Sequence, residues 1–194
     1  MKAAVCRKFK KPLVIEDIQL AAPGLNDIKV KIKACGICHS DIHYIEGAWG
    51  GTLPAVYGHE GAGIVEEVGR NVRHVKPGDH VVVTLIRYCG SCPACAAGNQ
   101  VLCEGKFDLS GRTPLSSRKG APITNGLSTG AFAEYVVVDG SQAVSIPKDM
   151  PFAPASLIGC AVITGMGAVI NTAGVSAGRS VAVIGTGGVG LNSI

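Results

Sequence analysis

Four cysteines lie close together in the chain with the spacing C-x2-C-x2-C-x7-C, at Cys89, Cys92, Cys95 and Cys103. The segment around them, residues 88–130, is rich in Cys, Gly, Ser and Pro and must be held by something other than an apolar core. Four thiolates in one short loop can close a tetrahedron around Zn2+ with no open position, which is typical of a structural zinc site. The alternatives are an iron–sulfur cluster, whose bacterial spacing has a shorter last gap followed by Pro, and free thiols in a loop. The spacing favours zinc.

The composition is that of a folded chain. With 194 residues, 47% hydrophobic and 16% charged, it has room for one full domain and a piece of another, and it lacks the signature of disorder. The net charge of +4 comes from Lys and Arg scattered among acidic residues. This pattern is typical of solvated strand faces and argues against a nucleic-acid footprint, which needs basic residues on one stripe.

The first residues return to charged side chains before an apolar core of signal-peptide length develops, so we expect the protein to be cytoplasmic. Because the cytoplasm keeps thiols reduced, the eight cysteines indicate metal binding or catalysis rather than disulfides. Between Asp149 and Arg179 the chain has no charged residue, but Pro and Gly interrupt this stretch. We interpret it as a buried helix next to a site rather than a membrane span, and we expect neither a membrane nor a nucleic-acid partner.

The N-terminal part predicts strands separated by Pro and Gly, at residues 3–5, 13–20, 28–34, 63–68 and 80–86. Alternation in IKVKIKA places Ile28, Val30 and Ile32 on one face and the lysines on the other, so this strand is half buried. Strand character resumes after the cysteine-rich loop, in AFAEYVVVDGSQAVSIP. We therefore expect a β-rich, barrel-like first domain.

The C-terminal part has a different pattern. Residues 151–174 have helical length, with Pro151 and Pro154 suited to a first turn. Residues 181–184 predict a buried parallel strand, followed by a glycine turn in the pattern G-x-G-x-x-G and a helix. In that context backbone N–H groups and the helix dipole hold a pyrophosphate. The alternative is a glycine turn that only packs a helix on a sheet.

Together these motifs resemble a known family. The segments GICHSDIH, GHEGAGIVEEVG, the four-cysteine loop, STGAFAEYVVV, LIGCAVITGMGAV and VAVIGTGGVG stand in the order seen in zinc-dependent alcohol dehydrogenases of the medium-chain dehydrogenase/reductase family. The resemblance covers essentially the whole chain and implies the N-terminal portion of such an enzyme. It implies a GroES-like zinc-binding catalytic domain at residues 1–162 and the first β-α unit of a Rossmann NAD(P)-binding domain at residues 163–194.

The resemblance also implies a catalytic zinc held by Cys38, His59 and Cys160, with Glu60 as a nearby carboxylate able to enter or leave the coordination shell. Two cysteines and one histidine are the established zinc ligands of alcohol dehydrogenases, so this ligand set rests on the resemblance alone. Three protein ligands leave a fourth position for an alcohol oxygen. Zn2+ there lowers the pKa of that oxygen and stabilises the alkoxide from which hydride departs to NAD or NADP.

The catalytic roles follow from the same resemblance. Ser40 is expected to accept the alcohol proton first and to pass it through the cofactor ribose to His43, since histidine exchanges protons near neutral pH. Asp41 is expected to orient His59 and fix its tautomer. Residues in the positions that bind the cofactor are His39, Thr164, Gly185, Gly187, Gly188, Val189 and Gly190.

Three further residues and several alternatives remain. Cys6 and Cys35 belong to neither zinc set and are predicted to be structural thiols, and Trp49 either lines the substrate pocket or packs in the core. The rival interpretations are a non-catalytic zinc-stabilised binding module, a zinc-free quinone or enoyl reductase, and a polyol or formaldehyde-adduct dehydrogenase. We expect a small alcohol or aldehyde substrate and a homo-oligomer, dimer or tetramer, at full length. Residues 1–194 alone are expected to be inactive.

Overall fold

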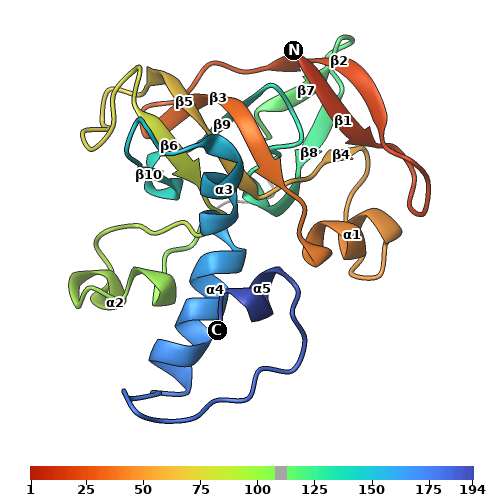
Figure 1. Cartoon of the computed structure of the whole chain (residues 1–194). Helices are drawn as coiled ribbons and strands as arrows, with labels where there is room; N and C mark the ends of the chain where they lie inside the picture. The colour runs from red at the N-terminus through yellow and green to blue at the C-terminus, as the bar shows by residue number, and fades with distance from the viewer. Residues whose placement is uncertain (108–112) are drawn as a thin grey trace.

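The computed structural model describes residues 1–107 and 113–194 and contains two β structures side by side (Figure 1). One is a closed barrel with the strand order β1-β2-β7-β8-β4, closed by the pairing of β4 with β1. Its strands are β1 (Lys2–Cys6), β2 (Val14–Leu20), β4 (Ala55–Val56), β7 (Leu115–Ser117) and β8 (Pro122–Asn125). Its core is apolar and consists of Ala3, Val5, Ile18, Val56, Leu115 and Ile123.

The other is a five-stranded sheet with the order β10-β6-β5-β3-β9. Its strands are β3 (Asp27–Gly36), β5 (Glu60–Val68), β6 (His80–Val83), β9 (Tyr135–Asp139) and β10 (Ala143–Ser145). The alternation predicted for β3 is confirmed, because Ile28 and Val30 are fully buried and Ile32 packs against the same valine-rich cluster. The long pairing of β3 with β5 brings the end of β3 next to the start of β5.

The barrel-like first domain is therefore confirmed, with differences in detail. The five strands predicted in the N-terminal part all form, although β6 ends at Val83 and not at residue 86. Strands β7 and β8 lie within the segment predicted to be loop. Their polar sequences have no clear alternation, and they form a hairpin because β2 and β4 supply partners on either side.

Short helices and single helical turns connect these strands. They are α1 (His39–Glu46), α2 (Pro93–Ala96), α3 (Phe152–Ser156), α4 (Ala161–Gly167) and α5 (Gly188–Leu191), with the turns η1 (Gln100–Leu102), η2 (Gly126–Ser128), η3 (Gly140–Gln142), η4 (Leu157–Gly159) and η5 (Ala168–Thr172). The lobe that contains α2 projects from the β body, and α3 leads into α4 below it (Figure 1).

The long helix predicted at residues 151–174 forms with a break at Cys160. The prediction that it is buried is wrong for α4, where Ile163 and Met166 are 42% and 49% exposed and only Ala161 and Gly165 are buried. The reason is that α4 packs mainly on its helical neighbours and on the short α5.

No single helix among the described residues is long and apolar enough to cross a membrane. A bent pair, Phe152–Gly159 with Ala161–Thr172 at 51°, meets the length and composition criteria together.

The predicted strand at residues 181–184 does not form, and this prediction is wrong for the chain described here. A parallel strand needs neighbouring strands and covering helices, and none of the described segments pairs with it. Ile184 is fully exposed. In the glycine-rich segment that follows, Gly185 has a φ of +98°, and a Cβ at Gly190 would lie 1.9 Å from the Gly185 carbonyl oxygen. The predicted boundary between residues 162 and 163 falls within α4 and stays a prediction.

Candidate metal centre

The four-cysteine loop brings its sulfurs together. The Sγ atoms of Cys89, Cys92, Cys95 and Cys103 all lie within 4.8 Å of one another. In a tetrahedral zinc site with Zn–S bonds of about 2.3 Å, the sulfurs are about 3.8 Å apart. The donor set is thus compact enough to contract onto one ion, and four thiolates leave no open position. The cluster fits a structural zinc site.

Backbone N–H groups stabilise the thiolate form of this loop. The amides of Cys89 and Gly105 donate to Cys103 Sγ at 3.2 Å, and the amide of Cys92 donates to Cys89 Sγ at 3.4 Å. Hydrogen bonds from the backbone of Ser91 and Cys92 lower the pKa of Cys89 to about 6, whereas burial raises that of Cys95 to about 12. A bound metal ion can keep all four sulfurs in the thiolate form at this spacing, because it takes the place of the thiol protons.

A second cluster joins residues from three distant segments. The ligand atoms of Cys38, His59, Glu60 and Cys160 lie within 4.8 Å of one another. Cys38 precedes α1, His59 directly precedes β5, Glu60 is its first residue, and Cys160 lies at the break between η4 and α4. Cys160 Sγ is 4.0 Å from Cys38 Sγ, close to the separation expected across a zinc ion. Two thiols, an imidazole and a carboxylate are donors that Zn2+ prefers, so the residues fit that metal.

Local structure fixes the first of these ligands. Cys38 is the N-cap of α1, and its Sγ accepts a hydrogen bond from the backbone N–H of Ser40 at 3.5 Å. Asp41 completes a capping box, because its Oδ2 accepts from the backbone N–H of Cys38 at 3.1 Å. A helix N-terminus favours negative charge, which suits a thiolate at the N-cap position.

Hydrogen bonds that the sequence did not predict fix the backbone next to Cys160. The Thr84 hydroxyl, just after β6, donates to the carbonyl oxygen of Gly159 at 3.1 Å and accepts from the backbone N–H of Ile86 at 3.3 Å. It thereby connects the β body to the residue before Cys160. A single Thr after a strand carries no signal in the sequence that would reveal this contact.

The second cluster favours positive charge. Burial lowers the pKa of His59, but hydrogen bonds to Asp41 and Cys160 outweigh it and raise the pKa to about 10. Burial raises the pKa of Glu60, while its contact with Cys160 acts in the opposite direction. The acidic groups that stabilise a proton on His59 would stabilise a divalent cation at the same place.

Helix α1 carries the residues expected to relay protons. Ser40 and His43 are three positions apart, so they lie on the same side of the helix, and both are half-buried. The His43 ring is 4.8 Å from the Trp49 ring and 5.6 Å from the His39 ring, measured between centroids. Trp49 is 56% exposed, so it is not a core residue. Its ring forms an accessible aromatic surface beside His43.

The residues expected to contact the cofactor lie on α1, on α4, and on α5 with the segment just before it. His39 and Thr164 are exposed, as are Gly185, Gly187, Gly188 and Val189, and Gly190 is half-buried. A Cβ at Gly165 would lie 2.5 Å from the Val189 carbonyl oxygen, so this glycine allows α5 to pack closely on α4. The short α5 therefore lies against α4, the helix that carries Thr164. These cofactor assignments stay predictions.

The two remaining cysteines lie outside both clusters. Cys6 is fully buried in the barrel region and Cys35 is half-buried in β3. Burial raises the pKa of both thiols, that of Cys35 to about 12. Such thiols are poor nucleophiles, in keeping with a structural role.

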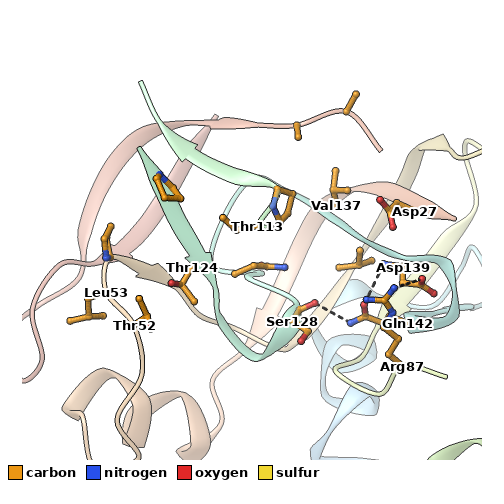
Figure 2. Close-up of a pocket in the computed structure, with 17 residues that line it drawn as sticks. Asp27, Thr52, Leu53, Arg87, Thr113, Thr124, Ser128, Val137, Asp139 and Gln142 are labelled. Carbon is orange, nitrogen blue, oxygen red and sulfur yellow. Dashed lines mark hydrogen bonds and ion pairs between the residues drawn. The ribbon is translucent and has the colours of Figure 1, made fainter. Parts of the chain in front are cut away.

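A cavity of about 520 Å3 lies in the β body, and Figure 2 shows the residues that line it. Arg87 and Asp139 form an ion pair of 2.9 Å at its wall, and Gln142 Nε2 donates to the Ser128 carbonyl oxygen at 3.1 Å. None of the eight clustered metal-ligand candidates lines it. The candidate metal centre is therefore identified by the chemistry of its donor atoms and not by this cavity.

Comparison with known proteins agrees with this geometry. The family described as alcohol dehydrogenase GroES-like domain matches residues 24–148. The chain is 43% identical over 197 residues to the class-3 alcohol dehydrogenase of Drosophila melanogaster, covering 98% of this chain and 52% of that protein. It is 42% identical over 200 residues to the S-(hydroxymethyl)glutathione dehydrogenase of Saccharomyces cerevisiae, covering 99% and 52%.

Solved structures give the same relationship. An alcohol dehydrogenase zinc-binding domain protein from Burkholderia ambifaria superimposes with a TM-score of 0.91 at 38% identity, over 99% of this chain and 54% of that one. Benzyl alcohol dehydrogenase from Acinetobacter calcoaceticus gives a TM-score of 0.75 at 32% identity, over 88% and 47%. The chain spans about half the length of the curated relatives that it matches. With both donor clusters formed on this fold, the chain belongs to the alcohol dehydrogenase GroES-like domain family.

Proposed function

We propose that the protein oxidises an alcohol to an aldehyde or ketone, and catalyses the reverse reaction, with zinc and with NAD or NADP as hydride carrier. The observation that carries this proposal is the second cluster, in which Cys38, His59 and Cys160 meet beside Glu60. A non-catalytic binding module would need only the four-cysteine loop. The names of the relatives support dehydrogenase chemistry on alcohols and on a hydroxymethyl adduct.

Each residue of the cluster has a role in this proposal. Zn2+, when bound, acts as a Lewis acid on the substrate oxygen. Cys38, His59 and Cys160 hold the ion, and Asp41 keeps His59 in the tautomer whose other ring nitrogen faces the cluster. The half-buried Ser40 and His43 lie on one face of α1 and form a path that moves the substrate proton away from the cluster.

The surroundings of the cluster bear on the substrate. The exposed ring of Trp49 beside His43 offers an apolar surface for the carbon part of a small alcohol. Residues 163–194 would begin the domain that binds the cofactor, with Thr164 and the turn Gly185–Gly190 on the cofactor side. In this proposal the complete protein is a homo-oligomer.

The test compares Cys38→Ser with Cys6→Ser in the complete protein. Both changes replace a sulfur by an oxygen, but only Cys38 belongs to a donor cluster. Turnover is followed as NADH or NADPH formation with primary alcohols, secondary alcohols, polyols and a hydroxymethyl thiol adduct. We expect Cys38→Ser to abolish turnover and to retain the zinc of the four-cysteine loop, while Cys6→Ser keeps both. Unchanged turnover in Cys38→Ser would refute the site.

A further inference from the structure

The carboxylate of Glu60 occupies the space where its neighbour on the next strand would have a side chain. Gly36 ends β3 and is the direct partner of Glu60, the first residue of β5, in the antiparallel register. Directly opposed residues of an antiparallel pair carry their side chains next to each other on one face. A Cβ on Gly36 would lie 2.1 Å from Glu60 Oε2 and 3.1 Å from Glu60 Cβ. The side chain of Glu60 therefore lies across the bare Cα of Gly36.

Backbone conformation does not explain the glycine. Gly36 does not have a positive φ, unlike Gly58, whose φ is +93°. A residue with a side chain can adopt the backbone of Gly36 without strain. What the position requires is the absence of a Cβ, and the atom that comes closest to the missing Cβ belongs to Glu60.

The placement matters because Glu60 is almost fully buried. It is 2% exposed, and a buried carboxylate is costly unless hydrogen bonds or cations compensate it. The ligand atoms of Cys38, His59 and Cys160 lie within 4.8 Å of its oxygen. Gly36 lies two residues before Cys38, so a side chain that crosses Gly36 reaches toward that ligand. If the Glu60 side chain pointed straight away from its own strand, its carboxylate would lie farther from Cys38.

We propose that Gly36 is a positioning residue. Because it has no side chain, it leaves the space in which the Glu60 carboxylate lies beside the other donors of the cluster. This inference rests on the proposed function only in that the cluster holds a metal ion. It concerns how strongly the chain holds that ion, and its test needs no catalytic turnover.

The proposal predicts that Gly36→Ala weakens Zn2+ binding at this cluster by about tenfold or more, the usual cost of losing a supporting group at a metal site. The methyl group would displace the carboxylate, so Glu60→Ala should weaken binding by a similar factor. In the Glu60→Ala background the added methyl group no longer meets a carboxylate. The double variant should then bind Zn2+ as Glu60→Ala does, which makes the two changes non-additive.

The experiment measures Zn2+ affinity by competition with a chromophoric chelator in the full chain with the four-cysteine loop loaded. Gly61→Ala is the matched control, because it adds a methyl group next to Glu60 on the same strand, with no atom closer than 3.3 Å. The affinity of Gly61→Ala and the zinc of the four-cysteine loop should be unchanged.

Each outcome of this experiment either supports or overturns the proposal. Unchanged affinity in Gly36→Ala overturns the proposal. The proposal is also overturned if the double variant binds Zn2+ more weakly than Glu60→Ala by the full effect of Gly36→Ala. The methyl group would then act on another neighbour, for instance on Leu157 at 2.9 Å. If Gly36→Ala misfolds and loses both ions, the double variant must restore folding, and failure to do so also overturns it. A wild-type chain that binds zinc only at the four-cysteine loop would instead refute the proposed function and this inference with it.

Discussion

One oxygen of the Asp41 carboxylate lies 3.1 Å from Nδ1 of His59, and the other accepts a hydrogen bond from the backbone N–H of Cys38 at 3.1 Å. Asp41 is fully buried and His59 is 1% exposed. Oδ1 also accepts from the backbone N–H of Gly58 at 3.0 Å. One carboxylate thus fixes two ligand residues from separate segments, and it does so entirely through its acceptor atoms.

Asp41→Asn should therefore weaken the second cluster. An amide replaces one acceptor with a donor, which would face either the N–H of Cys38 or the groups of Gly58 and His59. We expect Zn2+ affinity to fall by about 10–100-fold and the free energy of unfolding to fall by about 1–3 kcal/mol. Zinc competition and urea denaturation measure the two effects. Asp17→Asn, on the surface of β2, is the control, and equal behaviour of the two variants would contradict the role of Asp41.

Cys95→Ser should remove the zinc of the four-cysteine loop. The loop has no apolar core of its own, since Val101 and Leu102 are 73% and 67% exposed. The metal is thus its main source of stability. The zinc content measured by elemental analysis should fall from two ions per chain to one, and the melting temperature should fall as well. A brown protein with visible absorbance would instead identify an iron–sulfur cluster.

His43→Ala should slow alcohol oxidation in the complete protein mainly at lower pH. There hydroxide is scarce and the proton path over Ser40 and His43 is needed, whereas added buffer base should partly restore the rate. The pH dependence of kcat is the measurement, and the zinc content is the control. If the pH profile keeps its shape, His43 is not part of the path.

Arg7→Gln should reduce stability at neutral pH but not in acid. Arg7 Nε donates to Glu16 Oε1 at 2.8 Å between β1 and β2, and this bond lowers the pKa of Glu16. A lowered folded-state pKa stabilises the fold above the ordinary pKa of glutamate, and that stability is lost as the pH falls through the lowered value. The pair is partly exposed, so the loss should be at most about 1 kcal/mol. Urea denaturation across this pH range, with Lys8→Gln as the charge-matched control, tests the sign. A loss that persists in acid would contradict it.

Residues 1–194 alone should not bind NAD or NADP with measurable affinity. Residues 181–184 form no strand, and the exposed Gly187 and Gly188 are the N-cap and the first residue of a single-turn helix. A pyrophosphate site needs the glycine turn fixed between a sheet and a full helix. Isothermal titration calorimetry with both cofactors is the measurement, and zinc content shows that the sample is folded. Saturable binding would mean that the glycine turn is a sufficient site by itself.

The sequence by itself determined the features that depend on spacing and local pattern. The four-cysteine cluster forms because all its ligands lie in one short loop, and the alternation of Ile28 and Val30 with lysines fixed which face of β3 is buried. The glycine-rich segment after residue 184 leads into a short helix, and Gly190 lies so close to the carbonyl of Gly185 that a side chain would not fit there, whereas its role in a dinucleotide site stays a prediction.

Tertiary structure decided what depends on distant partners. The strands β7 and β8 exist because β2 and β4 pair with them, and the strand predicted at 181–184 is absent because nothing described pairs with it. Resemblance to a family named Cys38, His59 and Cys160 as ligands and Asp41 as the partner of His59. Only the fold shows that the same Asp41 carboxylate also holds the backbone of Cys38, and that Gly36 makes room for Glu60. The physical reason is that hydrogen bonds and steric exclusion act over a few ångströms in space, whereas Asp41 and His59, like Gly36 and Glu60, are far apart along the chain.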